Sequence, residues 1–320
     1  MVNSKYSRKF AAKFRTMKLK GYIFAALAAA AYGTNPIFAK PLYADGMNPD
    51  SVLLFRYLLA LILMGLIMLW SAFKKKKEGK TLAEAFHVAR HSLPQLIIMG
   101  LLMSASSILL FMSYNYMPVG IASTLLFVYP IMVAVIMTLC FHEKMSWLVV
   151  ACLALASIGV GLLCKTNGDT DSLYDTTSFM TGFALVMTSS LSYAIYLVGL
   201  NKTRIRTIAS MPVTFYVLLF GLSIYLFRIA FGVPLILPHT LSMWLNCLAL
   251  GIFPTVISLV FTSLAIQCIG STQTALFGAF EPVTAVVLGV LILGEQISVQ
   301  EAFGMLLIFL SVSMVMKRRG

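Results

Sequence analysis

Long apolar runs separated by short polar segments fill almost the whole chain of 320 residues. A helix needs about 20 apolar residues to cross the hydrocarbon core of a bilayer. Runs of this length favour helices over strands, because each membrane segment must satisfy its own backbone polar groups. The pattern predicts an all-α membrane protein with ten transmembrane helices, at 21–42, 50–73, 93–116, 118–141, 146–165, 179–200, 212–231, 243–267, 272–293 and 299–316.

The composition agrees with a membrane protein. Hydrophobic residues make up 60% of the chain and charged residues 11%, whereas about a quarter of a soluble domain is charged. The net charge of +13 does not indicate nucleic-acid binding, because the basic residues lie in short segments between apolar runs and at the two ends. The five cysteines lie in or beside apolar runs and form no CxxC motif, so neither a metal site nor a cofactor is expected.

The distribution of basic residues predicts the orientation of the spans. With the N-terminus inside, 20 of the 24 Lys and Arg residues fall in inner segments. Asp45, Asp50, Asp169, Asp171 and Asp175 fall outside instead. The excess of Lys and Arg on the cytoplasmic side is a general rule of membrane topology. Both termini are therefore expected in the cytoplasm, and the protein in the plasma membrane.

Two parts of the chain resemble each other. The segment YPIMVAVIMTLCFHE (129–143) matches EPVTAVVLGVLILGE (281–295) at four of 15 positions, including an early proline and a final glutamate. Tyr32 in the first predicted helix likewise corresponds to Tyr193 in the sixth. We therefore predict two repeats of five helices each, at 21–165 and 179–316.

The segments outside the repeats are a basic cytoplasmic tail (1–20), an acidic outer loop (166–178) and a basic C-terminus (317–320). Because five is an odd number, the second repeat would enter the membrane from the opposite side. Such inverted repeats are typical of transporters that expose a central site to each side in turn.

The order and spacing of these features resemble the EamA-type drug/metabolite transporter family. The features are the ten spans, Arg56 within the segment FRYLLA, and the glutamates that end the fourth and ninth spans, HE at 142–143 and GE at 294–295. The resemblance implies an exporter of small metabolites, commonly amino acids or related compounds. It also implies a central cavity lined mainly by helices 1, 3, 4, 6, 8 and 9.

Glu281 is the main candidate for chemistry, because it lies near the middle of an otherwise uncharged span. An ionised acid there costs about 2.5–3.5 kcal/mol on insertion scales, so it should face a cavity, pair with a partner or be protonated. It could contact a substrate amine or carry a coupling proton, or it could be a structural acid that fixes helix packing. Pro282 beside it can kink the helix. The corresponding residue of the first repeat is Tyr129.

Other candidates are polar or aromatic residues inside the spans. Asn35 can donate and accept hydrogen bonds, or repair the break expected at Pro36. Tyrosine rings attract ammonium groups, and serine hydroxyls can face a cavity, although both also serve packing. The candidates of this kind are Tyr32, Tyr129, Tyr193, Tyr196, Ser106 and Ser258.

A second set of candidates is structural or gating, and comprises Arg56, Pro36, Pro130, Pro254 and Pro282. Arg56 either binds a substrate carboxylate, extends to the outer membrane surface or makes a structural contact. Tyr114, near the outer end of its span, suits the membrane interface or a gate.

These features predict a secondary transporter, not an enzyme, that moves small amphipathic metabolites around a cavity in the membrane. The lipid bilayer and a small-molecule substrate are its expected partners, and a proton is a candidate coupling ion. No GxxxxGK[ST] motif indicates an ATPase. A carrier of nucleotide sugars or other phosphorylated metabolites is the alternative within transporters, and would need several basic residues in the cavity. A membrane enzyme acting on lipids, or a receptor, is the alternative from another class.

Overall fold

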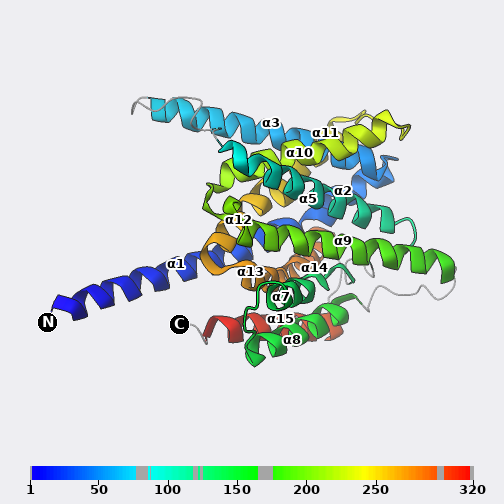
Figure 1. Ribbon diagram of the computed structural model, residues 1–320. Coiled ribbons are helices and arrows are strands. Elements are labelled where there is room, and N and C mark those ends of the chain that lie inside the picture. Colours follow the sequence, from blue (N-terminus) through cyan, green and yellow to red (C-terminus); the bar gives the residue numbers. More distant parts are fainter. Residues whose placement is uncertain are drawn as a thin grey trace.

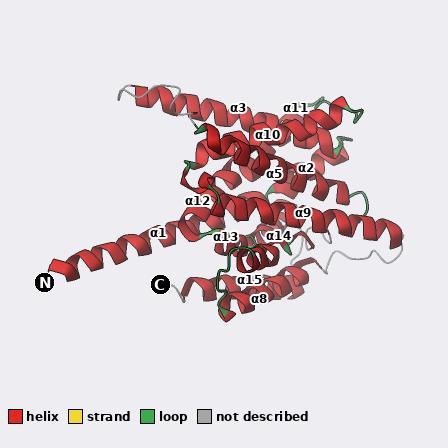
Figure 2. Ribbon diagram, viewed as in Figure 1, coloured by secondary structure: helices red, strands yellow, loops and turns green. Residues whose placement is uncertain are grey.

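The fold was obtained as a computed structural model that describes residues 2–76, 86, 88–117, 122, 125–164, 176–293 and 299–317. These residues form helices and connections, with no strand among them (Figure 2). The α-helices are α1 (Val2–Gly33), α2 (Asn35–Ala44), α3 (Pro49–Lys76), α5 (Leu93–Ser113), α7 (Tyr129–Leu139), α8 (Trp147–Cys164), α9 (Thr176–Lys202), α10 (Ser210–Ala230), α11 (Leu241–Gly251), α12 (Ser258–Ile269), α13 (Ser271–Phe277), α14 (Phe280–Leu293) and α15 (Val299–Lys317).

Short turns complete the described secondary structure. The π-helical turn η4 (Ile252–Ile257) joins α11 to α12, and 3-10 turns lie at Arg90–Ser92 (η1) and Arg204–Thr207 (η3). Most of the predicted acidic loop (166–175), Glu295 and the last residues of the chain (318–320) lie outside the described residues.

Six helical segments are long and apolar enough to cross a membrane: Met17–Ala44, Pro49–Phe73, Arg90–Ser113, Phe179–Lys202, Ser210–Ala230 and Leu241–Ile269. Shorter apolar helices lie at Tyr129–Leu139, Trp147–Leu162 and Ala302–Ser311. The prediction of an all-helical, multi-pass membrane protein is therefore confirmed for the part of the chain that is described.

The helices lie side by side along a common direction, which is horizontal in Figure 1. Helices α3, α10 and α11 form one edge of the bundle, and the paired α8 and α15 form the other. Between these edges, α5 packs along α9, and α1 packs along α12. The chain begins and ends at the same end of the bundle, on the left of Figure 1.

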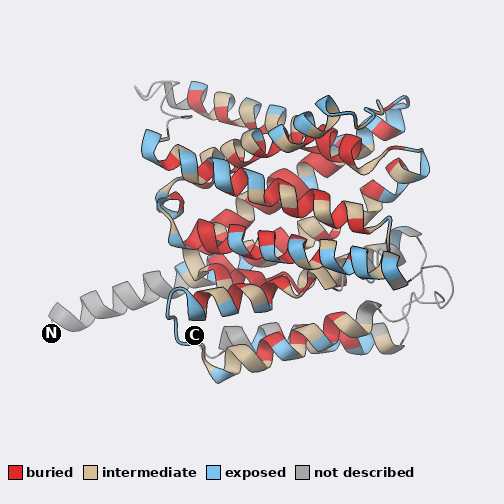
Figure 3. Cartoon of the chain, turned by 45° about the vertical axis from the view of Figure 1, so that its right-hand side comes forward, coloured by how far each residue is buried: buried red, intermediate tan, exposed pale blue. Residues whose placement is uncertain are grey.

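Large apolar side chains cover the outside of the bundle, as expected of a surface that faces lipid. Trp70 is 69% exposed and Leu291 is 74% exposed. Figure 3 shows buried positions on the inner faces of the helices and exposed ones on the outer faces. Exposed apolar area on this scale is rare in soluble monomers.

Hydroxyl groups bind α5 to α9 in the interior. The Ser189 hydroxyl donates to the Ser106 carbonyl oxygen at 2.7 Å, and the Ser192 hydroxyl donates to that of Leu102 at 2.8 Å. Small residues that hydrogen-bond across helices are typical of packing in membranes, where lipid supplies no hydrophobic force between helices.

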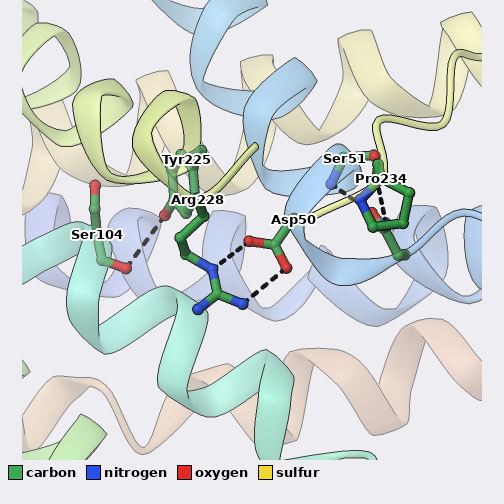
Figure 4. Close-up of polar contacts among 7 residues, drawn as sticks. Asp50, Ser51, Ser104, Tyr225, Arg228 and Pro234 are labelled. Carbon is green, nitrogen blue, oxygen red and sulfur yellow. Dashed lines mark hydrogen bonds and ion pairs between the residues drawn. The ribbon is translucent and has the colours of Figure 1, made fainter. Parts of the chain in front are cut away.

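Two ion pairs join distant parts of the chain near the opposite ends of the bundle. Arg228 at the end of α10 donates to Asp50 at the start of α3 through Nε at 2.5 Å and Nη2 at 3.2 Å (Figure 4). Lys202 at the end of α9 donates to Glu143, beyond α7, at 2.6 Å. The first pair is partly buried and the second is exposed, so the first contributes more to stability.

Candidate functional site

Four prolines named above lie where helices are interrupted. Pro36 stands in the first turn of α2, Pro130 in that of α7, Pro282 in that of α14, and Pro254 in the π-helical turn η4. Proline has no N–H and its ring clashes with the carbonyl group four residues earlier. The sequence therefore places irregular backbone in the middle of the bundle, which is tolerated inside a membrane only where protein buries it or a cavity adjoins it.

Three of the carbonyl oxygens released in this way have other donors. Leu126 O accepts from the Ser190 hydroxyl at 3.0 Å, Leu250 O from the Thr255 hydroxyl at 2.8 Å, and Gly278 O from the Glu281 N–H at 2.8 Å. These bonds fix the geometry of the breaks, and the last one sets the start of the helix that carries Glu281.

A cavity of about 90 Å³ lies beside these breaks. It has room for several water molecules or a small solute. Its lining residues come from both halves of the chain: Tyr32, Gly33, Asn35, Pro36, Leu110, Tyr114, Leu126, Phe127, Tyr129, Glu281, Pro282 and Ala285. We call it the larger cavity.

A smaller cavity of about 10 Å³ also borders Tyr129 and Glu281. It is lined by Ala25, Ala28, Ala29, Tyr129, Tyr193, Leu197, Thr262, Thr274, Ala275, Gly278 and Glu281. Tyr129 and Glu281 line both cavities, so the two cavities share this pair of side chains in their walls.

The carboxyl group of Glu281 has one hydrogen-bond contact to its described neighbours, a long one from Tyr129. The Tyr129 hydroxyl lies 3.5 Å from Glu281 Oε1 and 3.4 Å from the carbonyl oxygen of Ala275. Both distances are at the long end of the range for a hydrogen bond. The carboxyl group is half-buried in the bundle and free to take a stronger donor, such as a ligand ammonium.

Aromatic rings lie beside this carboxyl group. The Tyr129 ring packs edge-on against Tyr193 with 4.8 Å between centroids, and Tyr193 stacks on Tyr196 at 5.9 Å. Tyr32 lines the larger cavity. A cation near Glu281 would meet aromatic ring surfaces as well as the carboxylate.

Asn35 places an amide at the wall of the larger cavity. Its side chain is 8% exposed, and its Oδ1 has no hydrogen-bond partner among the described residues. A buried acceptor without a partner costs about 1–3 kcal/mol, unless water or a ligand satisfies it. Asn35 therefore holds an unsatisfied acceptor next to this cavity.

Arg56 is buried and does not extend to the membrane surface. It is 1% exposed, and its Nε donates to the Thr255 hydroxyl at 2.6 Å. Its Nη2 donates to the Pro254 carbonyl oxygen at 3.1 Å, and its guanidinium carbon lies 5.7 Å from the centre of the Tyr32 ring. The hypothesis that Arg56 extends to the membrane surface is therefore wrong, and a structural contact, with the π-helical turn, is observed.

Three sequence candidates lie apart from the two cavities. Ser106 faces Ser189 in the contact between α5 and α9, with 3.1 Å between the hydroxyl oxygens. Tyr196 is 1% exposed behind Tyr193, and Ser258 is buried in α12. None of the three lines the larger or the smaller cavity.

Two hydroxyl groups that line a cavity were not among the candidates from the sequence, and one ring expected at the membrane interface or a gate lines a cavity as well. Thr262 and Thr274 line the smaller cavity, and Tyr114 lines the larger one. Thr274 lies seven positions before Glu281, which is two turns away on one face of the continuous helix predicted at 272–293, and this spacing could have revealed it, although the structure interrupts that helix between α13 and α14. Thr262 had no such signal. Within the described residues no group of three or more His, Cys, Asp or Glu side chains is placed to hold a metal ion.

Comparison with known proteins gives relatives of one kind. The chain is 27% identical over 224 residues to an uncharacterized transporter of Synechocystis, a match that covers 68% of this chain and 64% of that protein. It is 24% identical to an uncharacterized transporter of Clostridium kluyveri, with 91% of each chain covered. It is 26% identical to the uncharacterized transporter YcbK of Bacillus subtilis, covering 89% of this chain and 88% of that one.

A solved crystal structure has the same fold. Its TM-score is 0.71 at 14% sequence identity, with 95% of this chain and 96% of that chain covered. Together with the apolar helices, these relatives define a multi-pass membrane transporter rather than an enzyme. The model of the EamA-like transporter family matches residues 19–164 and again 180–317. The chain belongs to this family, as the resemblance predicted.

Proposed function

We propose that the protein is a secondary transporter that moves small amphipathic metabolites, amino acids or related compounds, by alternating access around Glu281. The observation that carries this proposal is that Glu281 and Tyr129 line both cavities. A substrate in the larger cavity would replace the long contact from the Tyr129 hydroxyl to the carboxylate. Separation of these two side chains would then join the larger cavity to the smaller one.

Contacts between helices support the predicted inverted repeat. By their residues, α1 belongs to predicted span 1, α5 to span 3, α9 to span 6 and α12 to span 8. If spans 1–5 correspond to spans 6–10, the contact of α5 with α9 (spans 3 and 6) is equivalent to the contact of α12 with α1 (spans 8 and 1). The contact of α7 with α9 (spans 4 and 6) is likewise equivalent to that of α14 with α1 (spans 9 and 1). Tyr129 and Glu281, which occupy corresponding positions in the repeats, also face each other. This arrangement is the one used for alternating access in several transporter folds.

The ten-span topology belongs to the same proposal. The six long apolar segments would be joined by spans at α7, α8, α14 and α15, with helix breaks inside several of them. The bias of Lys and Arg supports cytoplasmic termini in the plasma membrane. The larger cavity would then lie on the outer side of Glu281 and the smaller one on the cytoplasmic side. Export is the direction that the family resemblance implies.

Transport by the purified protein in liposomes tests the proposal. Vesicles would be loaded with labelled amino acids, amines or nucleotide sugars, and efflux measured with and without a pH gradient. We expect Glu281→Gln to slow the efflux of an amino acid or amine by about 10-fold or more, because a charged hydrogen bond contributes about 1.5–3 kcal/mol.

The matched control is Glu143→Gln, which removes an exposed acid outside both cavities. It should leave efflux within about twofold of the wild type, since exposed ion pairs contribute little. Wild-type efflux from Glu281→Gln would refute the role of this residue. Efflux of nucleotide sugars alone would replace the proposed substrate class. An effect of the pH gradient that Glu281→Gln removes would identify the coupling ion as a proton.

A further inference from the structure

Arg56 is a charged residue in the interior, and no carboxylate of the described residues lies beside it. The two acids that form ion pairs with described residues, Asp50 and Glu143, are bound to Arg228 and Lys202. Within the described part of the chain, no carboxylate oxygen lies within the 4.0 Å limit of an ion pair with Arg56. A buried charge without a counter-charge is costly, and inside membranes such residues commonly mark substrate pathways.

The unused side of the guanidinium has the shape of an anion site. A guanidinium carries five N–H donors, of which Arg56 uses one on Nε and one on Nη2. Its Nη1 has no hydrogen-bond partner among the described residues. Three donors thus remain, two on Nη1 and one on Nη2, and one from each of these nitrogens can form a parallel pair that matches the two oxygens of a carboxylate. Thr255 and Pro254 hold the opposite side and fix the direction of this pair.

Tyr32 links this arginine to the Glu281 site. The Tyr32 ring lies 5.7 Å from the Arg56 guanidinium carbon, and the same residue lines the larger cavity together with Glu281. Arg56 itself does not line that cavity, whereas Tyr32 borders both the guanidinium and the cavity. Rotation of Tyr32 would open the guanidinium to the cavity. Side-chain rotations of this kind are fast compared with transport.

We propose that Arg56 is an anion subsite of the transport site, which takes the carboxylate of a substrate whose ammonium group binds Glu281. This inference rests on the proposed function of Glu281. One guanidinium with one free pair of donors matches a single carboxylate. A phosphate or diphosphate would need further cations, and none of the residues that line the larger cavity is Lys or Arg. The two opposite charges select molecules that carry both groups.

The test uses three related compounds for each of three side chains. Alanine, leucine and phenylalanine are compared with their amides, which lack the carboxylate, and with propionate, 4-methylpentanoate and 3-phenylpropionate, which lack the ammonium. Affinities are measured from the thermal stabilisation of the purified protein. We expect the wild type to bind at least one amino acid about 30-fold or more tightly than either partner compound, as for other buried charge pairs.

Variants separate a binding role of Arg56 from a structural one. In Arg56→Gln, the affinity for the amino acid should fall to that for its amide, while the affinity for the amide stays unchanged. A purely structural role would lower both affinities together. If Arg56→Gln does not fold, Arg56→Lys takes its place in the test. This variant keeps the charge but loses the pair of donors, so it should retain part of the preference for the amino acid over its amide. Arg228→Gln, which removes an ion-paired arginine outside both cavities, should leave the preference intact.

Each outcome decides one of the two proposals. Equal binding of amide and amino acid by the wild type would overturn the anion subsite, and so would failure of all three amino acids to bind. A preference for carboxylates that survives in Arg56→Gln would also overturn it. The role of Glu281 is judged separately, from whether Glu281→Gln loses the preference for amino acids over their deaminated partners.

Discussion

Replacing Gly278 by alanine should force Tyr129 away from Glu281. Gly278 lies in the break between α13 and α14. A Cβ atom at this position would overlap the Tyr129 hydroxyl oxygen and lie 2.9 Å from the Ala275 carbonyl oxygen. The backbone φ of Gly278 is −55°, which alanine adopts without strain. The effect of the substitution is therefore steric and falls on the pair of side chains that lines both cavities.

The expected loss of unfolding free energy in Gly278→Ala has two parts. Overpacking of an interior costs about 1–3 kcal/mol, and loss of the long hydrogen bonds of Tyr129 adds up to about 1 kcal/mol. Tyr129→Phe alone should cost about 0.5–1 kcal/mol. The double variant, Gly278→Ala with Tyr129→Phe, should lose about 1–2 kcal/mol less unfolding free energy than the two single losses added together. The reason is that phenylalanine lacks the oxygen that the new methyl group meets.

Unfolding of the purified protein in detergent would measure this double-mutant cycle. Gly161→Ala is the matched control, since a Cβ at Gly161 in α8 meets no atom within 4 Å. Alanine in a helix is favoured over glycine by about 1 kcal/mol, so this variant should be neutral or stabilised. Additive effects of Gly278→Ala and Tyr129→Phe, within about 0.3 kcal/mol, would refute the predicted overlap.

Three further predictions concern polar contacts. Asp50→Asn should destabilise the protein by about 1–2 kcal/mol, because the Asp50 carboxylate is largely buried while Arg228 is partly solvated. Exchange of the two residues (Asp50→Arg with Arg228→Asp) should restore part of this loss in the same unfolding assay. Lys202→Gln should cost less than about 1 kcal/mol and nothing measurable in 1 M salt, since its ion pair is exposed; a larger, salt-independent loss would contradict this. Thr255→Val should cost about 1–3 kcal/mol of unfolding free energy, because it leaves Arg56 Nε and Leu250 O without a partner. Thr255→Ser keeps the hydroxyl and should unfold like the wild type, so equal losses in both variants would argue against the hydrogen bonds.

The sequence predicted the helices well because the bilayer imposes a strong pattern on it. Runs of about 20 apolar residues are needed for each span, so the long helices could be placed within a few residues. The prolines added the positions of the breaks, since each removes a specific hydrogen bond. That α1 ends at Gly33 and α2 begins at Asn35 follows from Pro36 in this way.

The site was harder to predict because its members meet only through packing between helices. Glu281 was evident as a charge within an apolar run, and Pro282 as a helix breaker. The sequence did not reveal that Ser106 faces α9 while Thr262 faces a cavity, because both are small polar residues in apolar helices. Arg56 was evident as a charge, but its burial depends on the π-helical turn around Pro254, which no periodicity predicts.

The contact between Tyr129 and Glu281 has a consequence for the proposed inverted repeat. Corresponding residues that touch lie on the two-fold axis, where symmetry brings each residue to its own counterpart. Two glutamates at this place would hold two like charges about 4 Å apart, a repulsion of about 4 kcal/mol at an effective dielectric constant of 20. A tyrosine at one of the two positions supplies a hydroxyl donor instead of the second charge. If the two halves form an inverted repeat, they can therefore share its axis with a single carboxylic acid, and a residue on that axis would be expected to border both cavities, as Glu281 does.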